Sequence, residues 1–164
     1  MVVNFHELYK KYAQDVHRFA YWLCGNEQEA EDITSETFIR ALTAAENIRA
    51  ETVKGYLLTI ARNLALKKLK QAKRITDLTT NLPAAFEGLD RTVETRLSLQ
   101  GVMQFLQSLP EVDRAALLMH IQEDLPYEEI ARALGISVAS ARVKVHRMRI
   151  KLNEYRMKAE ESAP

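Results

Sequence analysis

The chain has 164 residues, of which 47% are hydrophobic and 27% charged, and its formal net charge is +1. This length allows one ordinary domain or two small ones, and the apolar content excludes disorder throughout the chain. Because the net charge is close to zero, any surface for an anionic partner must come from a local cluster of basic residues.

Apolar residues at three- and four-residue steps predict three amphipathic helices within residues 1–74. The first ends at Gly25, the second covers about 30–42, and the third begins at Val53 after a polar break at 45–52. The residues expected on their buried faces are Phe5, Leu8, Tyr9, Tyr12, Val16, Phe19, Ala20 and Leu23 in the first, Ala30, Ile33, Thr37, Phe38, Ala41 and Leu42 in the second, and Val53, Tyr56, Leu57, Ile60, Ala61, Leu64, Ala65 and Leu69 in the third. Three such faces can bury a common core, which predicts one small domain.

The periodic pattern stops at residues 75–93, which contain polar residues, a proline and a glycine, and this segment is predicted to be a flexible linker. Helical pattern resumes near Val93, and Pro110 opens a further helix. Two more helices are expected at 127–134 and from Val138 to about Met157, so the second domain covers 94–164. The predicted fold is all-α, with two small helical domains joined by the linker. An apolar patch at 82–86 could also hold the two domains together.

Residues 125–149 have the features of a helix-turn-helix. Ala131 is small where the two helices of such a motif cross. Gly135 permits a tight turn, and Ser137 can cap the free N–H groups of the following helix. The buried face of that second helix is predicted to consist of Ala141, Val145, Met148 and Leu152. The motif therefore places its second helix in a position to contact DNA.

The second helix of this motif also carries a local excess of positive charge. Residues 137–158 contain seven Lys or Arg residues and one acid, Glu154. This excess is typical of a surface that binds phosphates, although a solvated basic helix would have the same composition. Arg142 and Arg147 are the best candidates for base edges, because a guanidinium pairs bidentately with guanine. Val143 lies off the buried face and either contacts a thymine methyl group or is simply exposed.

Three motifs together resemble those of a known family. The segment Ala30-Glu-Asp-Ile-Thr-Ser-Glu-Thr-Phe-Ile-Arg-Ala41 resembles the region-two signature of bacterial sigma factors, and residues 56–63 resemble the following helix of that domain. Leu109-Pro110 and residues 127–149 resemble region four. The order, spacing and short length are similar to those of the extracytoplasmic-function sigma factors. The resemblance implies a sigma factor that binds core RNA polymerase and promoter DNA.

The resemblance implies that the second helix binds the clamp helices of the largest polymerase subunit. The matching positions are Glu31, Asp32, Ser35, Glu36 and Arg40. The residues themselves favour a protein partner over DNA, since this helix is acidic, and a merely solvated helix is the alternative. Ser35 departs from the family pattern, which often has Gln at that position.

The resemblance also implies that the loop before the third helix, and the beginning of that helix, read and open the minus-ten promoter element. The matching residues are Asn47, Arg49, Arg62 and Asn63, with phosphate contacts from Lys67, Lys70 and Arg74. Residues 67–74 contain five cations in eight positions, which suits DNA phosphates or a solvated helix end. Tyr56 stands where the family usually has Trp, and it is either a core residue or a stacking platform for an unstacked base.

The C-terminal motif matches the part of the family that reads the minus-thirty-five element. The residues predicted to bind DNA there are Ser140, Arg142, Val143, Lys144, His146, Arg147 and Arg149. The resemblance further implies contact with the flap tip of the polymerase and control by an anti-sigma factor. We expect no cofactor and no metal, since no Cys/His cluster has ligand spacing.

Other functions fit the sequence less well. A stand-alone helix-turn-helix repressor or activator would explain residues 125–149 but not the acidic second helix. An enzyme is not expected, because no Gly-rich phosphate loop, nucleophile elbow or His-Glu-x-x-His motif occurs. The single cysteine, Cys24, lies on an apolar stretch, which favours a buried inert thiol over a redox sensor. Without a signal peptide or a membrane-spanning run, a cytoplasmic protein is predicted.

Overall fold

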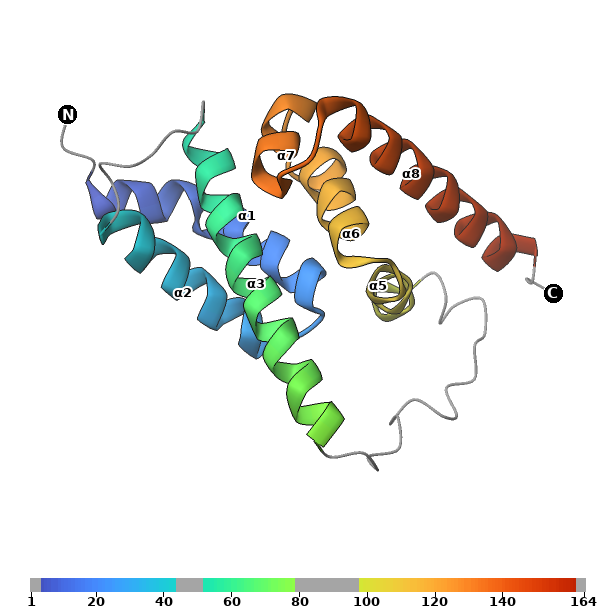
Figure 1. Cartoon of the computed structure of the whole chain (residues 1–164), viewed down its shortest axis with the longest axis horizontal. Coiled ribbons are helices and arrows are strands. Elements are labelled where there is room, and N and C mark those ends of the chain that lie inside the picture. The colour runs from blue at the N-terminus through green and yellow to red at the C-terminus, as the bar shows by residue number, and fades with distance from the viewer. Residues whose placement is uncertain (1–3, 44–51, 79–97, 162–164) are drawn as a thin grey trace.

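The computed structural model describes residues 4–43, 52–78 and 98–161, and every regular element within them is helical, which confirms the predicted all-α class. The N-terminal region consists of α1 (Phe5–Cys24), α2 (Glu27–Thr43) and α3 (Val53–Leu78). The C-terminal region consists of α5 (Leu99–Ser108), α6 (Glu111–Leu117), the π-helix η2 (Leu118–Gln122), α7 (Tyr127–Leu134) and α8 (Val138–Glu161). In Figure 1 the helices α1, α2 and α3 lie together, and α6 and α7 stand between them and α8.

A tight turn between α1 and α2 fixes how these two helices pack. Gly25 ends α1 in the left-handed conformation, with φ of 74°, and its N–H donates to the Tyr21 carbonyl at 2.7 Å. Glycine suits this position because residues with a side chain rarely adopt that conformation. The side chain of Asn26 then accepts from the Glu29 N–H at 2.9 Å, which satisfies a free donor in the first turn of α2. The two helices therefore lie side by side from their junction onward.

The apolar faces of the helices meet in one continuous core that extends through both regions. Phe19, Phe38 and Met119 are at most 1% exposed, and burial of each contributes about 1.5–3 kcal/mol. The predicted buried faces are confirmed at most positions but wrong at four, which are 38–44% exposed: Phe5, Tyr9, Leu42 and Val53. All four lie near helix ends, where a neighbouring helix covers less of the side chain.

Two elements differ from the expectations of the sequence. α3 continues to Leu78, so residues 75–78, predicted to begin the linker, are helical. The helix that follows Pro110 changes from α to π geometry at Leu118, and the Glu123 N–H donates to the Leu118 carbonyl at 3.1 Å. Such a widened turn is not visible in apolar periodicity. The rest of the predicted linker, including the apolar patch at 82–86, lies outside the described residues.

The two regions contact each other directly. α1 packs against α5, α6 and η2, and α3 packs against α7. α8 packs on the other side of the C-terminal region, against α6 and α7 (Figure 1). None of the described helices is both long and apolar enough to cross a membrane.

Candidate nucleic-acid interface

The helix-turn-helix predicted from the sequence is formed by α7 and α8. Gly135 has φ of 66°, and its N–H donates to the Ala131 carbonyl, which ends α7. The hydroxyl of Ser137 accepts from the Ser140 N–H at 3.0 Å, so the predicted cap of α8 is confirmed. Ala141, Val145 and Met148 are at most 3% exposed, while Leu152 is half-buried. Because one face of α8 is fixed in the core, the opposite face points to solvent.

The exposed face of α8 carries the residues predicted to bind DNA. Arg142, Val143, His146, Arg147 and Arg149 are exposed, and Ser140 and Lys144 are partly exposed. The Arg142 guanidinium lies over the Tyr127 ring, 5.6 Å from its centroid. Lys144 Nζ pairs with Asp113 Oδ1 at 2.9 Å, so this amine is held toward α6. The exposed fraction of Val143, 44%, fits both a thymine contact and a plain surface position.

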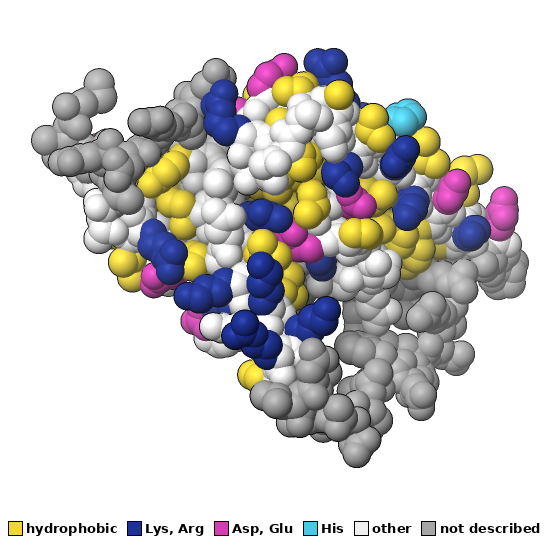
Figure 2. Space-filling view, in the orientation of Figure 1, with side chains coloured by type: hydrophobic (Ala, Val, Ile, Leu, Met, Phe, Trp, Pro, Cys, Tyr) yellow, Lys and Arg dark blue, Asp and Glu magenta, His cyan; other side chains and the backbone are white. Residues whose placement is uncertain are grey.

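A second basic surface covers the C-terminal half of α3. Lys67, Lys70 and Arg74 are exposed, and Figure 2 shows dark blue Lys and Arg side chains gathered over this part of the molecule. Asn63 is exposed nearby. Arg62 is different, since only 9% of it is exposed. The predicted residues Asn47 and Arg49 lie outside the described residues.

Arg62 is held by the C-terminal region. Its Nε and Nη2 atoms donate to the two carboxylate oxygens of Glu111 on α6, at 2.9 and 2.8 Å. A bidentate pair of this kind is among the stronger and more directional ion pairs in proteins. In this arrangement the guanidinium predicted to contact DNA is therefore occupied by a carboxylate of the same chain.

A surface hollow of about 340 Å³ lies between α2 and α3, next to the basic surface of α3. It is lined by Arg40, Thr43, Tyr56, Ile60 and Asn63. Tyr56 is half-buried and packs against the core, and it also forms part of this wall, so its position fits both alternatives left open by the sequence. An aromatic ring, an apolar side chain and an amide in one hollow can stack on a base and hydrogen-bond to its edge.

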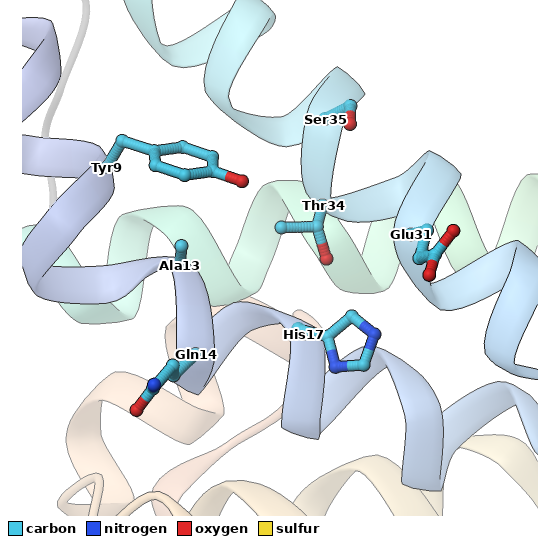
Figure 3. Close-up of a pocket in the computed structure, with 7 residues that line it drawn as sticks. All are labelled: Tyr9, Ala13, Gln14, His17, Glu31, Thr34 and Ser35. Atoms are coloured by element: carbon cyan, nitrogen blue, oxygen red, sulfur yellow. The ribbon is translucent and has the colours of Figure 1, made fainter.

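The acidic residues of α2 do not share one surface. Glu31 and Ser35 line a groove of about 580 Å³ between α1 and α2, which His17 and Tyr9 close from the α1 side (Figure 3). Asp32 faces α3 instead, with its carboxylate 3.8 Å from Lys68 Nζ. The predicted set of polymerase contacts is therefore divided between two sides of the helix.

Glu36 and Arg40 pair with each other, with Arg40 Nε 3.1 Å from Glu36 Oε1. Both side chains are about half exposed, so the pair contributes little to stability and leaves both groups accessible.

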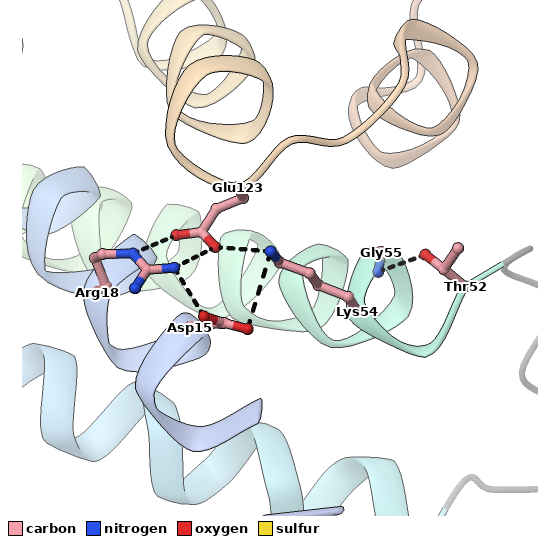
Figure 4. Close-up of polar contacts among 6 residues, drawn as sticks. All are labelled: Asp15, Arg18, Thr52, Lys54, Gly55 and Glu123. Carbon is pink, nitrogen blue, oxygen red and sulfur yellow. Dashed lines mark hydrogen bonds and ion pairs between the residues drawn. The ribbon is translucent and has the colours of Figure 1, made fainter. Parts of the chain in front are cut away.

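An ion-pair cluster between the regions was not predicted from the sequence. Glu123, just after η2, is 1% exposed and accepts from Arg18 Nε and Nη2 at 2.9 Å each. Lys54 Nζ lies 3.3 Å from the same carboxylate, and Asp15 pairs with Arg18 at 2.8 Å (Figure 4). The hydrogen bond to Glu123 raises the pKa of the Arg18 guanidinium above its ordinary value.

A second unpredicted contact lies at the beginning of α3. Glu129 Oε1 accepts from the Thr52 N–H at 3.1 Å and from the Thr52 hydroxyl at 2.7 Å. The same hydroxyl oxygen accepts from the Gly55 N–H at 3.0 Å (Figure 4). A Cβ atom at position 55 would lie 2.8 Å from Glu129 Oε1, so a larger residue there would require this carboxylate to shift.

An amide contact completes the interface between the regions. Gln107 of α5 donates from Nε2 to the carbonyls of Trp22 and Leu23 at 3.2 Å each, in the last turn of α1. Its Oε1 accepts from Arg114 Nη1 at 2.6 Å. Burial lowers the pKa of the Arg114 guanidinium. The side chain of Gln107 therefore links the free carbonyls of one region to a buried cation of the other.

Cys24 ends α1 close to this contact. Its pKa is raised to about 11, mainly by burial and secondarily by the nearby Glu29. A thiol with this pKa stays protonated at neutral pH, and protonated thiols are poor nucleophiles. The environment agrees with the interpretation of Cys24 as an inert packing residue.

Comparison with known proteins gives consistent matches along the chain. Residues 8–75 match the family model described as Sigma-70 region 2, and residues 99–152 match that described as Sigma-70, region 4. The chain is 35% identical over 160 residues to the ECF RNA polymerase sigma factor SigE of Mycolicibacterium smegmatis. This alignment covers 91% of the chain but 60% of SigE. It is 26% identical to the ECF RNA polymerase sigma factor SigM of Bacillus subtilis, covering 89% of this chain and 91% of SigM.

A solved structure matches both helical regions. It is the sigma factor RpoE in complex with the anti-sigma factor NepR from Bartonella quintana. The TM-score is 0.76 at 22% sequence identity, and the match covers 94% of this chain and 97% of the other. At this identity the match establishes a shared fold.

Proposed function

Because the chain belongs to the extracytoplasmic-function sigma factors of the sigma-70 family, we propose that it is a dissociable, non-enzymatic subunit that directs core RNA polymerase to promoters. The C-terminal region reads the minus-thirty-five element through α8, and the N-terminal region reads and opens the minus-ten element. Contacts through both regions raise the effective concentration of each, so neither needs to bind tightly alone.

The hollow between α2 and α3 is the observation that carries this proposal. Strand opening requires a place for an unstacked base, and the hollow offers the Tyr56 ring together with the Asn63 amide. The exposed cations Lys67 and Lys70 follow one and two turns further along α3, where they can contact the phosphates of the same strand. A repressor that reads only duplex DNA has no use for such a hollow.

The exposed polar residues of α2 support polymerase as one protein partner, and the structural match supports an anti-sigma factor as another. The exposed acids Glu31 and Asp32, with Ser35, Glu36 and Arg40, are the proposed contacts for the clamp helices of the polymerase. RpoE of Bartonella quintana was solved with an anti-sigma factor bound, and we propose that this chain is also held by such a protein until a signal releases it.

The function is tested by run-off transcription with purified core polymerase on a pool of genomic promoter fragments. The expected result is a set of transcripts that depend on this protein and share two spaced upstream elements. Asn63→Ala should lower their yield and reduce permanganate reactivity of thymines near minus ten, whereas the exposed control Asn153→Ala should change neither. Tight binding to duplex operators without polymerase, and no protein-dependent transcripts, would instead identify a stand-alone regulator.

A further inference from the structure

The ring of Tyr127, the first residue of α7, is contacted by side chains from two other helices. The imidazole of His120 stacks on it, with the ring centroids 4.4 Å apart and the planes inclined by 14°. The Arg142 guanidinium lies over the same ring, 5.6 Å from its centroid. The three groups belong to η2, α7 and α8, so the ring joins the helix-turn-helix to the helix that precedes it.

His120 limits how far the Tyr127 ring can turn. It lies in η2, where the Glu123 N–H donates to the Leu118 carbonyl at 3.1 Å. This π geometry displaces the residues of the turn relative to a continuing α-helix, and π turns often occur at functional sites. The imidazole Nδ1 also lies 3.3 Å from the carbonyl oxygen of Leu125, two residues before Tyr127. Because the imidazole is stacked on the tyrosine ring, that ring cannot turn without losing the contact.

Arg142 differs from Lys144 in what restrains it. Lys144 pairs with Asp113 at 2.9 Å, so its amine has to leave an acid before it can reach a phosphate. Among the described residues, no hydrogen bond or ion pair involves the Arg142 guanidinium, whose contact is with a ring. A guanidinium over a ring keeps the N–H groups at its edge available for hydrogen bonds. Arg142 is therefore restrained while its donors stay unused.

This kind of restraint matters for base recognition. A free arginine side chain loses rotamer freedom when it binds, and this loss opposes binding. Bidentate pairing with guanine also requires one orientation of the guanidinium. Arg142 lies in the second turn of α8, in the N-terminal part from which a recognition helix contacts base edges. A ring that already restrains the guanidinium reduces the loss of freedom on binding.

We propose that Tyr127 is a positioning residue for Arg142: its ring, with the His120 imidazole stacked on it, keeps the guanidinium oriented for pairing with guanine in the major groove. The guanidinium stays over the ring in the complex, so Tyr127 strengthens the preference for one base pair without contacting that base pair itself. This inference rests on the proposed function, because it takes promoter DNA as the ligand of α8.

The first measurement needs no DNA. Ring currents shift protons above an aromatic face upfield, so in NMR spectra of the full chain the δ protons of Arg142 should lie upfield of those of Arg147, which has no ring contact among the described residues. Tyr127→Phe should keep this shift, because only the ring is needed, and Tyr127→Leu should abolish it. Equal Arg142 shifts in the wild type and Tyr127→Leu would overturn the inference.

The second measurement is base preference. Core polymerase reconstituted with the full chain transcribes promoters randomised in the upstream element, each with a barcode in its transcribed part. Arg142→Ala and Arg147→Ala each identify the base pair that the removed guanidinium reads. Tyr127→Leu should lower the guanine preference at the Arg142 base pair about two- to fivefold, as expected for loss of an exposed cation–π contact, and leave the Arg147 base pair unchanged.

Conservative changes separate positioning from general damage. Tyr127→Phe should restore the preference, and His120→Ala should lower it less than Tyr127→Leu does. Tyr155→Leu is the matched control, since it removes a ring that stacks on Phe105 at 4.7 Å in the same region. It should change the preference at neither base pair, and a change equal to that of Tyr127→Leu would overturn the specific role of Tyr127.

The remaining outcomes are distinct. An equal loss at every base pair would indicate a phosphate contact, and a stronger preference in Tyr127→Leu would show that the ring withholds Arg142 from DNA; either would overturn the inference. If circular dichroism shows that Tyr127→Leu is unfolded, Tyr127→Met fills the space without a ring and should give the same results. No transcription dependent on the wild-type protein would overturn the proposed function and the base-reading role together, whereas a missing ring-current shift overturns only the positioning of Arg142.

Discussion

The two surfaces proposed to bind DNA differ in how accessible they are. On α8 the guanidinium groups of Arg142 and Arg147 are exposed on a helix whose other face is fixed in the core. On α3 the corresponding guanidinium, Arg62, is 9% exposed and paired with Glu111. The surface suited to duplex DNA is therefore ready in the free protein, while part of the surface suited to an opened strand is covered. If the proposed roles hold, the protein can search duplex DNA through α8 before the α3 surface is fully exposed.

The largest expected effect concerns the accessible surface. The double variant Arg142→Ala, Arg147→Ala should lower transcription from promoters with a minus-thirty-five element about a hundredfold or more, since each bidentate base contact contributes about 1–3 kcal/mol. Run-off transcription with core polymerase measures the loss, and Lys10→Ala with Lys11→Ala on α1 is the charge-matched control. An equal loss in the control would show that only total charge matters.

The next effect concerns the reactivity of the Cys24 thiol at the end of α1. Because the pKa of Cys24 is raised to about 11, its thiolate fraction at pH 8 is about a hundredth of that of an ordinary thiol or less, and alkylation should be slower in proportion. The rate should keep rising with pH up to about 11, since only the thiolate reacts. Mass spectrometry after iodoacetamide treatment measures this rate. Reaction as fast as that of an unfolded peptide would show that α5 does not cover the end of α1.

A smaller effect is expected from Gly55→Ala. The added methyl group would lie 2.8 Å from Glu129 Oε1, so the carboxylate must move and the contact with Thr52 weakens. Alanine also favours helix by about 1 kcal/mol, so α3 itself should not suffer. Energy transfer between dyes on cysteines introduced at the exposed positions Gln28 and Asn153, in a Cys24→Ala background, should fall only slightly, because a single contact between the regions is weakened. A double-mutant cycle with Glu129→Gln should give non-additive changes, and additivity would contradict the proposed contact.

The smallest effect is expected at Lys144. Its amine is held by Asp113 at 2.9 Å, so it has to leave this partner before it can reach a phosphate. Lys144→Ala should therefore reduce binding to a minus-thirty-five duplex only about threefold, well below the effect of Arg147→Ala. Duplex binding at two salt concentrations measures both. Losses of equal size would show that the pair with Asp113 does not restrain Lys144.

The helix-turn-helix could be predicted in detail because its determinants are local. The cap at Ser137, the turn at Gly135 and the buried face of Ala141, Val145 and Met148 are all set by residues within a few turns of one another. Helix number and order in the described residues follow from the same short-range periodicity. The π turn at η2 and the extension of α3 to Leu78 could not be predicted, because they depend on packing rather than on local pattern.

The interface between the regions is invisible to sequence reasoning for a physical reason. Glu111, Glu123 and Glu129 look like ordinary solvated acids, since glutamate is usually exposed. Their partners lie 49, 105 and 77 residues away in the chain. No periodicity connects positions so far apart, and the assignment of Arg62 to DNA gave no sign that it is also held by a carboxylate.

The close approach of Gly55 to Glu129 has a consequence for how members of this family diverge. A Cβ atom at position 55 would lie 2.8 Å from Glu129 Oε1 and 3.0 Å from the Thr52 hydroxyl, so glycine is favoured most where an acid at position 129 contacts the first turn of α3. Related chains that replace the acid should carry alanine at the glycine position more often than those that keep it. The two positions should therefore co-vary among related chains, although one lies in the N-terminal region and the other in the helix-turn-helix.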